Sequence, residues 1–193
     1  MSSFMTNLLI LALLALGVWG VMLYNLLVRD RNRVLAGWSD ISVQLKRRHD
    51  LIPKLVEVVK QYAGYERATL EKVVSLRTQS EQALHDSTGA TAQKGELESR
   101  LGGEVRRLLA LAEGYPDLKA SGNFLELQRE ISNVEDQIQY ARRYYNGAVR
   151  NLNTRIDSFP DLLIARLFGY RHAEYFQLDD AAESEPVELG MGD

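Results

Sequence analysis

Two short polar clusters contain the side chains best suited to binding or chemistry in this 193-residue sequence. The first cluster consists of Lys46, Arg47, Arg48, His49 and Asp50. The second consists of Arg142, Arg143 and Asn146, with Tyr144 and Tyr145 between them. Because ammonium and guanidinium groups bind phosphates and carboxylates, both clusters are candidate interaction sites.

The first cluster has two interpretations, and the sequence leaves both open. As a binding surface, it would contact anionic lipid head groups or an acidic partner. A helix that continues straight from the apolar segment 8–28 would place Lys46 about 27 Å beyond its end. That distance exceeds the Debye length of about 8 Å, which disfavours direct lipid binding. As a structural element, Arg48 or Asp50 would enter the helical core and pair with a polar residue of another helix, and this interpretation is favoured.

The second cluster combines arginine with tyrosine, a composition that can bind single-stranded nucleic acid by stacking. Tyr145, however, fits a seam of apolar residues at helical spacing, which favours a core position. Glu135 or Asp136 lies one or two turns away and could pair with the arginines. The net charge of −3 also disfavours nucleic acid, because counterion release requires an excess of positive charge. We therefore expect no nucleic-acid partner.

The sequence contains no constellation that is typical of catalysis or metal binding. It has no cysteine, which excludes thiolate zinc sites and cysteine nucleophiles. None of the three histidines has the Glu-x-x-His spacing of di-metal bundles, and only Glu81 and His85 form a weak pair. No glycine-rich phosphate loop, Gly-x-Ser-x-Gly or His-Glu-x-x-His occurs. The sequence predicts a protein that is not an enzyme and holds neither cofactor nor metal.

Residues 8–28 form an uncharged apolar run that predicts a transmembrane helix. A helix of this length spans about 31 Å, which matches the hydrocarbon core of a bilayer. Arg29, Arg31 and Arg33 follow at once and end the span. A cleaved signal peptide is disfavoured, because residues 1–7 carry no lysine or arginine. The positive-inside rule predicts an N-terminus outside the cell and a cytoplasmic bundle.

Apolar spacing predicts four long helices after the span, and three of them precede residue 114. The first ends at Gly64, and its seam consists of Val34, Trp38, Ile41, Leu45, Ile52, Leu55, Val59 and Tyr62. Arg48 occupies a seam position, and Pro53 predicts either a kink around 49–52 or a new helix start capped by Asp50. The next two cover about 66–85 and 93–113, separated by a turn at 86–91. Their apolar faces are expected to contain Leu70, Val73, Arg77 and Leu84, and then Leu97, Leu101, Leu108 and Leu111.

The longest helix is predicted over residues 124–159. Its seam consists of Phe124, Leu127, Ile131, Val134, Ile138, Ala141, Tyr145, Ala148, Leu152 and Phe159, and only Arg155 interrupts it. Such a helix would be roughly 54 Å long, a length that indicates a bundle or coiled coil. Pro160 ends it, and a short helical turn follows over 162–168.

These elements predict an all-α fold in which a transmembrane helix is followed by an antiparallel bundle of long helices. The expected organisation is a short tail at 1–7, the span at 8–28 and the bundle at 29–178. An acidic stretch at 179–193 is poor in apolar residues and predicts disorder.

Two long motifs resemble the LemA family of bacterial membrane proteins. They are YNLLVRDRNRVLAGWSDISVQLKRRHDLIPKLVEVVKQYAGYE and NFLELQREISNVEDQIQYARRYYNGAVRNLNTRIDSFPDLLIARLFGY, and the similarity extends to Phe176. Gly37, Lys54 and Tyr65 stand where the family typically has alanine, asparagine and histidine. The resemblance implies a single-pass anchor and an antiparallel bundle, with no established catalytic residues. It also implies relatives linked to magnetosome membrane formation.

The favoured function is a non-enzymatic scaffold or adaptor of the bacterial inner membrane, which acts through unidentified protein partners or by forming homo-oligomers. An alternative is a membrane-remodelling protein that assembles on the bilayer. An enzyme or metal carrier is the least favoured hypothesis.

Overall fold

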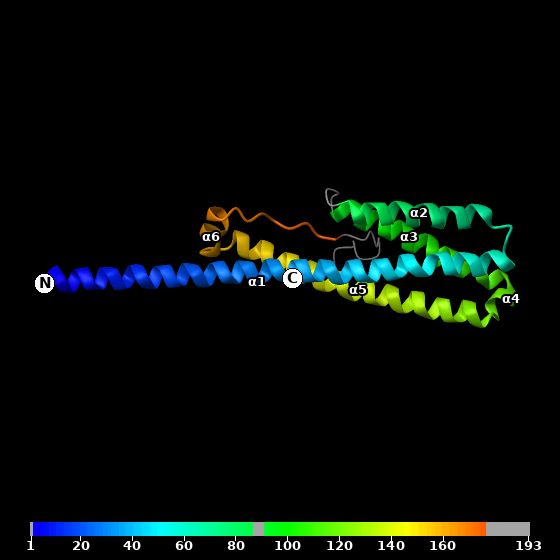
Figure 1. Ribbon diagram of the computed structural model, residues 1–193, viewed down its shortest axis with the longest axis horizontal. Helices are drawn as coiled ribbons and strands as arrows, with labels where there is room; N and C mark the ends of the chain where they lie inside the picture. The colour runs from blue at the N-terminus through cyan, green and yellow to red at the C-terminus, as the bar shows by residue number, and fades with distance from the viewer. Residues whose placement is uncertain (1, 87–90, 177–193) are drawn as a thin grey trace, which may run out of the picture. The chain divides into compact units, whose positions relative to one another are not determined.

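The computed structural model describes residues 2–86 and 91–176, and within these ranges every regular element is a helix. The helices are α1 (Ser2–Tyr62), α2 (Arg67–His85), α3 (Thr91–Leu111), the 3₁₀ helix η1 (Ala112–Gly114), α4 (Pro116–Lys119), α5 (Gly122–Asp157) and α6 (Asp161–Leu167). Figure 1 shows their order along the chain. The predicted all-α fold is confirmed. The short helix α4 was not predicted, and residues 179–193 and most of the predicted turn at 86–91 lie outside the described ranges.

The chain folds into two compact units that share α1 and α5. The first unit contains Met1–Ile41 and Gln139–Tyr175, and the second contains Ser42–Ile138 and Phe176–Asp193. The first unit therefore holds the N-terminal part of α1, the C-terminal part of α5, and α6. The second holds the remainder of α1 and α5 together with α2, α3 and α4.

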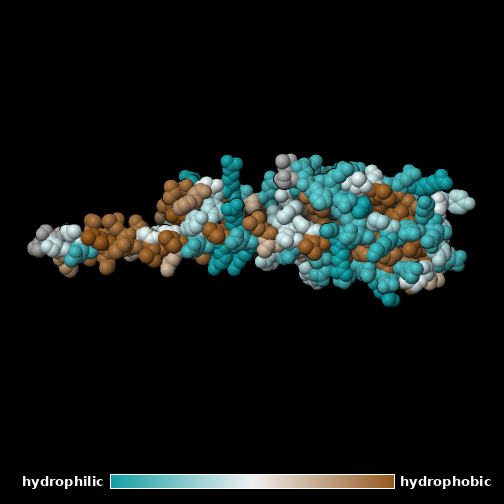
Figure 2. Space-filling view, viewed as in Figure 1, coloured by the Kyte–Doolittle hydropathy of each residue, from teal (hydrophilic) through white to brown (hydrophobic). Residues whose placement is uncertain are grey.

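In the first unit, the N-terminal part of α1 exposes its apolar side chains. Within the described residues, α1 is the one helix long and apolar enough to cross a membrane. Phe4, Leu11 and Leu14 are 73%, 69% and 64% exposed, and Figure 2 shows this segment as a mostly apolar surface. Such a surface is costly in water and suited to lipid.

The second unit packs long stretches of α1, α2, α3 and α5 together with the short α4, and its core follows most of the predicted seams. Its buried apolar residues include Leu45, Ile52, Leu55, Val59, Leu70, Val73, Leu101, Leu108, Phe124, Leu127, Ile131, Val134 and Ile138. The predicted seam is wrong at Tyr62, which is 43% exposed because α1 ends there and the chain turns. In α3 the buried face contains Glu98 and Val105.

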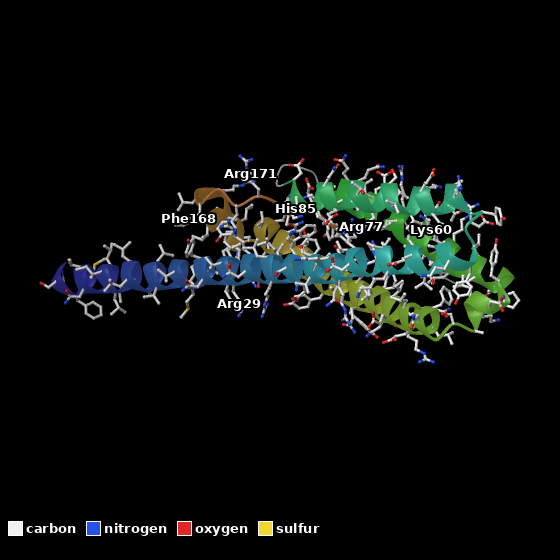
Figure 3. All side chains as sticks on the ribbon, turned by 45° about the vertical axis from the view of Figure 1, so that its right-hand side comes forward. Arg29, Lys60, Arg77, His85, Phe168 and Arg171 are labelled. Carbon is white, nitrogen blue, oxygen red and sulfur yellow. The ribbon has the colours of Figure 1, made fainter. Side chains whose placement is uncertain are left out.

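Pro53 does not interrupt α1, so the predicted helix restart capped by Asp50 is wrong. Proline has no N–H group, and it therefore leaves the carbonyl four residues earlier, that of His49, without its usual helical donor. Arg77 of α2 supplies a donor, because its Nε lies 3.0 Å from the His49 carbonyl oxygen. Figure 3 shows Arg77 between α2 and α1. A hydrogen bond from another helix thus compensates for the proline.

The Arg77 hydrogen bond and Pro53 should show energetic coupling. We expect Arg77→Met to lower the free energy of unfolding by about 1–2 kcal/mol, because it leaves the His49 carbonyl unpaired. In a Pro53→Ala background the loss should shrink, since the introduced alanine supplies a backbone N–H to the same carbonyl. Denaturant unfolding of the four proteins in the cycle measures the coupling. Equal losses in both backgrounds would contradict this role of Arg77.

The predicted seam of the longest helix is also wrong at Phe159. The helix ends at Asp157, so Phe159 lies beyond it and is 78% exposed. After Pro160 the chain forms α6, which Gly169 closes with φ +69°, a backbone conformation that glycine adopts without strain. The segment after Gly169 is held on α5 by Asn153, whose side chain exchanges two hydrogen bonds with the backbone of Ala173 at 2.9 and 3.0 Å.

Candidate functional site

The guanidinium of Arg48 is a buried polar group of the second unit. Its side chain is 2% exposed, at the seam position that the sequence assigned to it. Nη1 donates to Glu135 Oε1 of α5 at 2.8 Å, and Nη2 donates to Glu98 of α3 through both its carboxylate and its carbonyl oxygen, the latter at 2.9 Å. Arg48 therefore connects α1, α3 and α5, while the Arg77 bond adds α2 at the same level.

His49 completes this buried cluster. Its Nε2 lies 3.0 Å from Glu98 Oε1, and both side chains are almost fully buried. Burial acts to raise the pKa of Glu98, but the contacts with His49 and Arg48 outweigh it and hold the pKa below its ordinary value. Glu98 is thus an ionised carboxylate between two basic side chains. This arrangement connects α1 with α3.

Gly102 provides the space that the Arg48 guanidinium occupies. A Cβ atom at this position would lie 3.1 Å from Arg48 Nη1 and 3.9 Å from the carboxylate oxygens of Glu135. The adjacent Gly103 has no atom within 4 Å of the corresponding position. Gly102 therefore has a packing reason to be glycine in the middle of α3, whereas Gly103 has none.

The two glycines should respond differently to alanine. We expect Gly103→Ala to raise the free energy of unfolding by about 1 kcal/mol, the ordinary helical preference of alanine over glycine. Gly102→Ala should not raise the free energy of unfolding in this way, because the added methyl group would lie too close to Arg48. Thermal unfolding of both variants measures the difference. An equal stabilisation by both substitutions would show that Arg48 does not need this space.

The charged form of Glu98 should stabilise the folded state in a pH-dependent way. Because folding lowers its pKa, its contribution is complete above the ordinary value of 4.5 and is lost as the pH falls through the lower folded value. We expect the stability gap between the wild type and Glu98→Gln to narrow as the pH falls below about 4.5. Unfolding midpoints across this range measure the gap, with Glu57→Gln as an exposed control. A gap independent of pH would contradict the assignment.

The remaining residues of the first cluster do not enter the core. Lys46, Arg47 and Asp50 are not buried on α1, while Arg48 and His49 are buried. Of the two residues proposed to enter the bundle, the structure places Arg48 inside and Asp50 outside. The cluster is therefore divided between a buried ionic contact and a charged surface.

The second cluster lies in the first unit and is also divided. Arg142 is buried, Asn146 is partly buried and Arg143 is exposed. Glu135, suggested by the sequence as a partner of these arginines, pairs instead with Arg48. Tyr145 is buried as expected, and its hydroxyl donates to the Glu174 carbonyl at 2.8 Å.

An exposed aromatic surface accompanies this cluster on α5. Tyr140 and Tyr144 are 61% and 52% exposed, one helical turn apart. The guanidinium carbon of Arg143 lies 4.8 Å from the centre of the Tyr140 ring, within cation–π distance. We call Tyr140, Arg143 and Tyr144 the α5 surface. Arg143 and Tyr140 contact each other, and all three side chains remain open to solvent.

A buried ionic network in the first unit was not predicted as a site. Asp30 is 3% exposed and accepts a hydrogen bond from Arg155 Nε at 2.6 Å. Arg33 Nη1 lies 3.2 Å from Asp30, and Arg155 Nη1 lies 3.1 Å from Asp161 at the start of α6. In the sequence, only Arg155 indicated this network, because it interrupts the apolar seam of the longest helix. It does so to join α1, α5 and the start of α6.

No group of three or more potential metal ligands is found within residues 2–86 and 91–176. The arrangement of the charged side chains instead consists of paired arginines and carboxylates between helices. Such contacts join side chains of different helices.

The exposed apolar end of α1, and the ion pairs that join the other helices, define a membrane-associated, all-helical protein. The profile of the LemA family matches residues 37–189, and the chain belongs to this family. It is 31% identical to protein LemA of Metamycoplasma hominis, over 86% of this chain and 72% of the relative. It is 25% identical to magnetosome protein MamQ 2 of Paramagnetospirillum magneticum, over 85% and 68%. It is 23% identical to magnetosome protein MamQ of Magnetospirillum gryphiswaldense, over 91% and 72%. None of these names is that of an enzyme.

Proposed function

We propose that this protein is a non-enzymatic scaffold or adaptor, anchored in the bacterial inner membrane by a single span. The basic residues directly after the apolar segment favour an N-terminus outside the cell and the remaining helices in the cytoplasm. The observation that carries the proposal is the α5 surface, where Tyr140, Arg143 and Tyr144 are exposed together.

Tyrosine and arginine are enriched where proteins bind one another, and they contribute disproportionately to binding energy. The contact between Arg143 and Tyr140 restricts both side chains before binding, which lowers the entropy cost of ordering them. Arg48, in contrast, is already paired with two carboxylates inside the second unit. Binding through the surface is therefore assigned to the α5 surface, whereas Arg48 serves the fold.

Site-specific photocrosslinking of the full chain in membranes tests this role. A benzophenone amino acid at position 140 should give a discrete crosslinked product, either to another protein or to a second copy. The same group at position 65, where Tyr65 is fully exposed on the second unit, serves as a control. Tyr144→Ala should reduce the product at position 140. The proposal fails if position 140 gives no product beyond the control.

A second candidate function is membrane remodelling by assembly on the bilayer. The family membership and the relatives named magnetosome proteins favour it. Reconstitution of the full chain into liposomes at high density, followed by electron microscopy, distinguishes this candidate. Tubulated or constricted liposomes would support it, and unchanged spherical liposomes would count against it.

A further inference from the structure

Helix α6 of the first unit exposes an apolar face that the fold itself does not use. Ala165 and Asp161 are buried, whereas Leu163 and Leu167, one turn apart, are 58% and 76% exposed. Phe168, directly after the helix, is 56% exposed. A helix whose inward face is small and whose outward face carries leucine and phenylalanine requires an apolar environment on its outer side.

The contact between Phe168 and α1 identifies that environment. Its ring centre lies 4.7 Å from the ring centre of Tyr24. Tyr24 belongs to the apolar segment and precedes its end at Val28 by four residues, or about 6 Å along the helix axis. Figure 3 shows Phe168 beside α1. The tip of α6 therefore lies at the level of the last turns of the apolar segment.

The apolar segment itself changes character at this level. From Phe4 to Met22 its large apolar side chains are exposed, whereas Leu23 is 8% exposed and Leu27 is fully buried. The protein thus covers α1 from Leu23 onwards and leaves the preceding residues for the hydrocarbon. This places the outer face of α6 in the interfacial layer, where aromatic side chains are favoured.

A pocket of about 480 Å³ adjoins this face. It is lined by Tyr24, Arg31, Val34, Leu35, Leu152 and residues 168–173, including Arg171. Within the described part of the chain, neither Arg31 nor Arg171 takes part in an ion pair, whereas His172 pairs with Asp157 at 3.0 Å. Two available guanidinium groups and tyrosine rings beside a bilayer surface match an anionic phosphate ester.

We propose that α6 and this pocket form a second contact with the membrane. Leu163, Leu167 and Phe168 enter the interfacial layer of the leaflet in which the apolar segment ends, and Arg31 and Arg171 bind the phosphate of an anionic phospholipid. The contact fixes the first unit against the bilayer, in addition to the span. This inference goes beyond the scaffold role and holds whether or not the α5 surface binds a partner.

The depth of α6 can be measured in the full chain, because the protein has no cysteine. Leu167→Cys, labelled with an environment-sensitive fluorophore, is reconstituted in nanodiscs of phosphatidylcholine and phosphatidylglycerol. Lipids with a nitroxide near the carbonyl should quench this label strongly. A label at Tyr140→Cys, which is similarly exposed in the same unit, should be quenched little. Equal quenching at both positions, or crosslinking between Leu167→Cys copies without quenching, would overturn the proposal.

The lipid site has a separate test. Native mass spectrometry of the full chain in mixed micelles should show retained phosphatidylglycerol in preference to phosphatidylcholine. Arg31→Gln with Arg171→Gln should weaken retention roughly twenty-fivefold, since each basic residue at an anionic surface contributes about fivefold. Arg150→Gln, an exposed arginine of the same unit, should have little effect. Displacement by excess inorganic phosphate, or an equal loss in the Arg150 variant, would contradict a phospholipid site.

Discussion

Replacing Arg48 by methionine is expected to lower the free energy of unfolding by about 3–5 kcal/mol, because it leaves the Glu98 carboxylate buried without its guanidinium partner. Glu98 is 1% exposed and cannot reach solvent without opening the core. For a chain of this size the loss corresponds to a fall in the unfolding midpoint of about 10 °C. Circular dichroism of the full chain in detergent measures it.

Two controls separate this effect from a general loss of charge. Arg47→Met changes the adjacent but exposed residue and should stay within about 0.5 kcal/mol of the wild type. Combining Arg48→Met with Glu98→Met should recover most of the stability, since an apolar pair of similar volume can replace a buried ion pair. A loss in the double variant as large as the sum of the two single losses would show that the pairing does not explain the destabilisation.

The second large effect is expected for Asp30→Ala in the first unit. Arg155 would lose its closest carboxylate, and Arg33 would lose the same partner. Hydrogen bonds to charged groups contribute about 1.5–3 kcal/mol, and Arg155 keeps Asp161, so we expect a loss of about 2 kcal/mol. The hydrogen bond with Asp30 also raises the pKa of Arg155, consistent with a favourable contact. Thermal unfolding in detergent provides the measurement.

Asp40→Ala offers a matched control for Asp30→Ala. Asp40 is an exposed aspartate ten residues further along the same helix, also in the first unit. We expect its replacement to change stability by less than about 0.5 kcal/mol. If both substitutions have equal effects, the network around Asp30 contributes no more than an ordinary surface charge.

The helices and most of their buried faces could be predicted because each helix buries one apolar stripe, and its period appears directly in the sequence. Errors occur where the helix stops while the pattern continues. Tyr62 is the last residue of α1, and Phe159 follows the end of α5, so both are exposed although their spacing fits the seam. Periodicity reports a face, whereas the point where the chain turns decides where that face ends.

The sequence indicated the arginines of the ionic contacts but not the carboxylates that pair with them. Arg48 and Arg155 stand at seam positions, which signals a buried charge in need of a partner. Their partners depend on how one helix is aligned with the next, and the period of a single helix does not contain that information. Glu98 lies on the buried face of α3 with Leu101 and Val105. The predicted face passed through Leu97 instead and therefore did not include Glu98. The role of Gly102 likewise follows from Arg48 packing against it from another helix.

A single span is expected to separate the N-terminus from the helical units, and topology labelling measures on which side of the membrane each part lies. Single cysteines at Ser3 and Ser132, both exposed, are introduced separately into the cysteine-free chain. A membrane-impermeant thiol reagent is applied to intact cells, with any outer membrane permeabilised, and to lysed cells. We expect Ser3→Cys to be labelled in intact cells and Ser132→Cys only after lysis. Labelling of both positions from the same side would contradict a single-pass anchor.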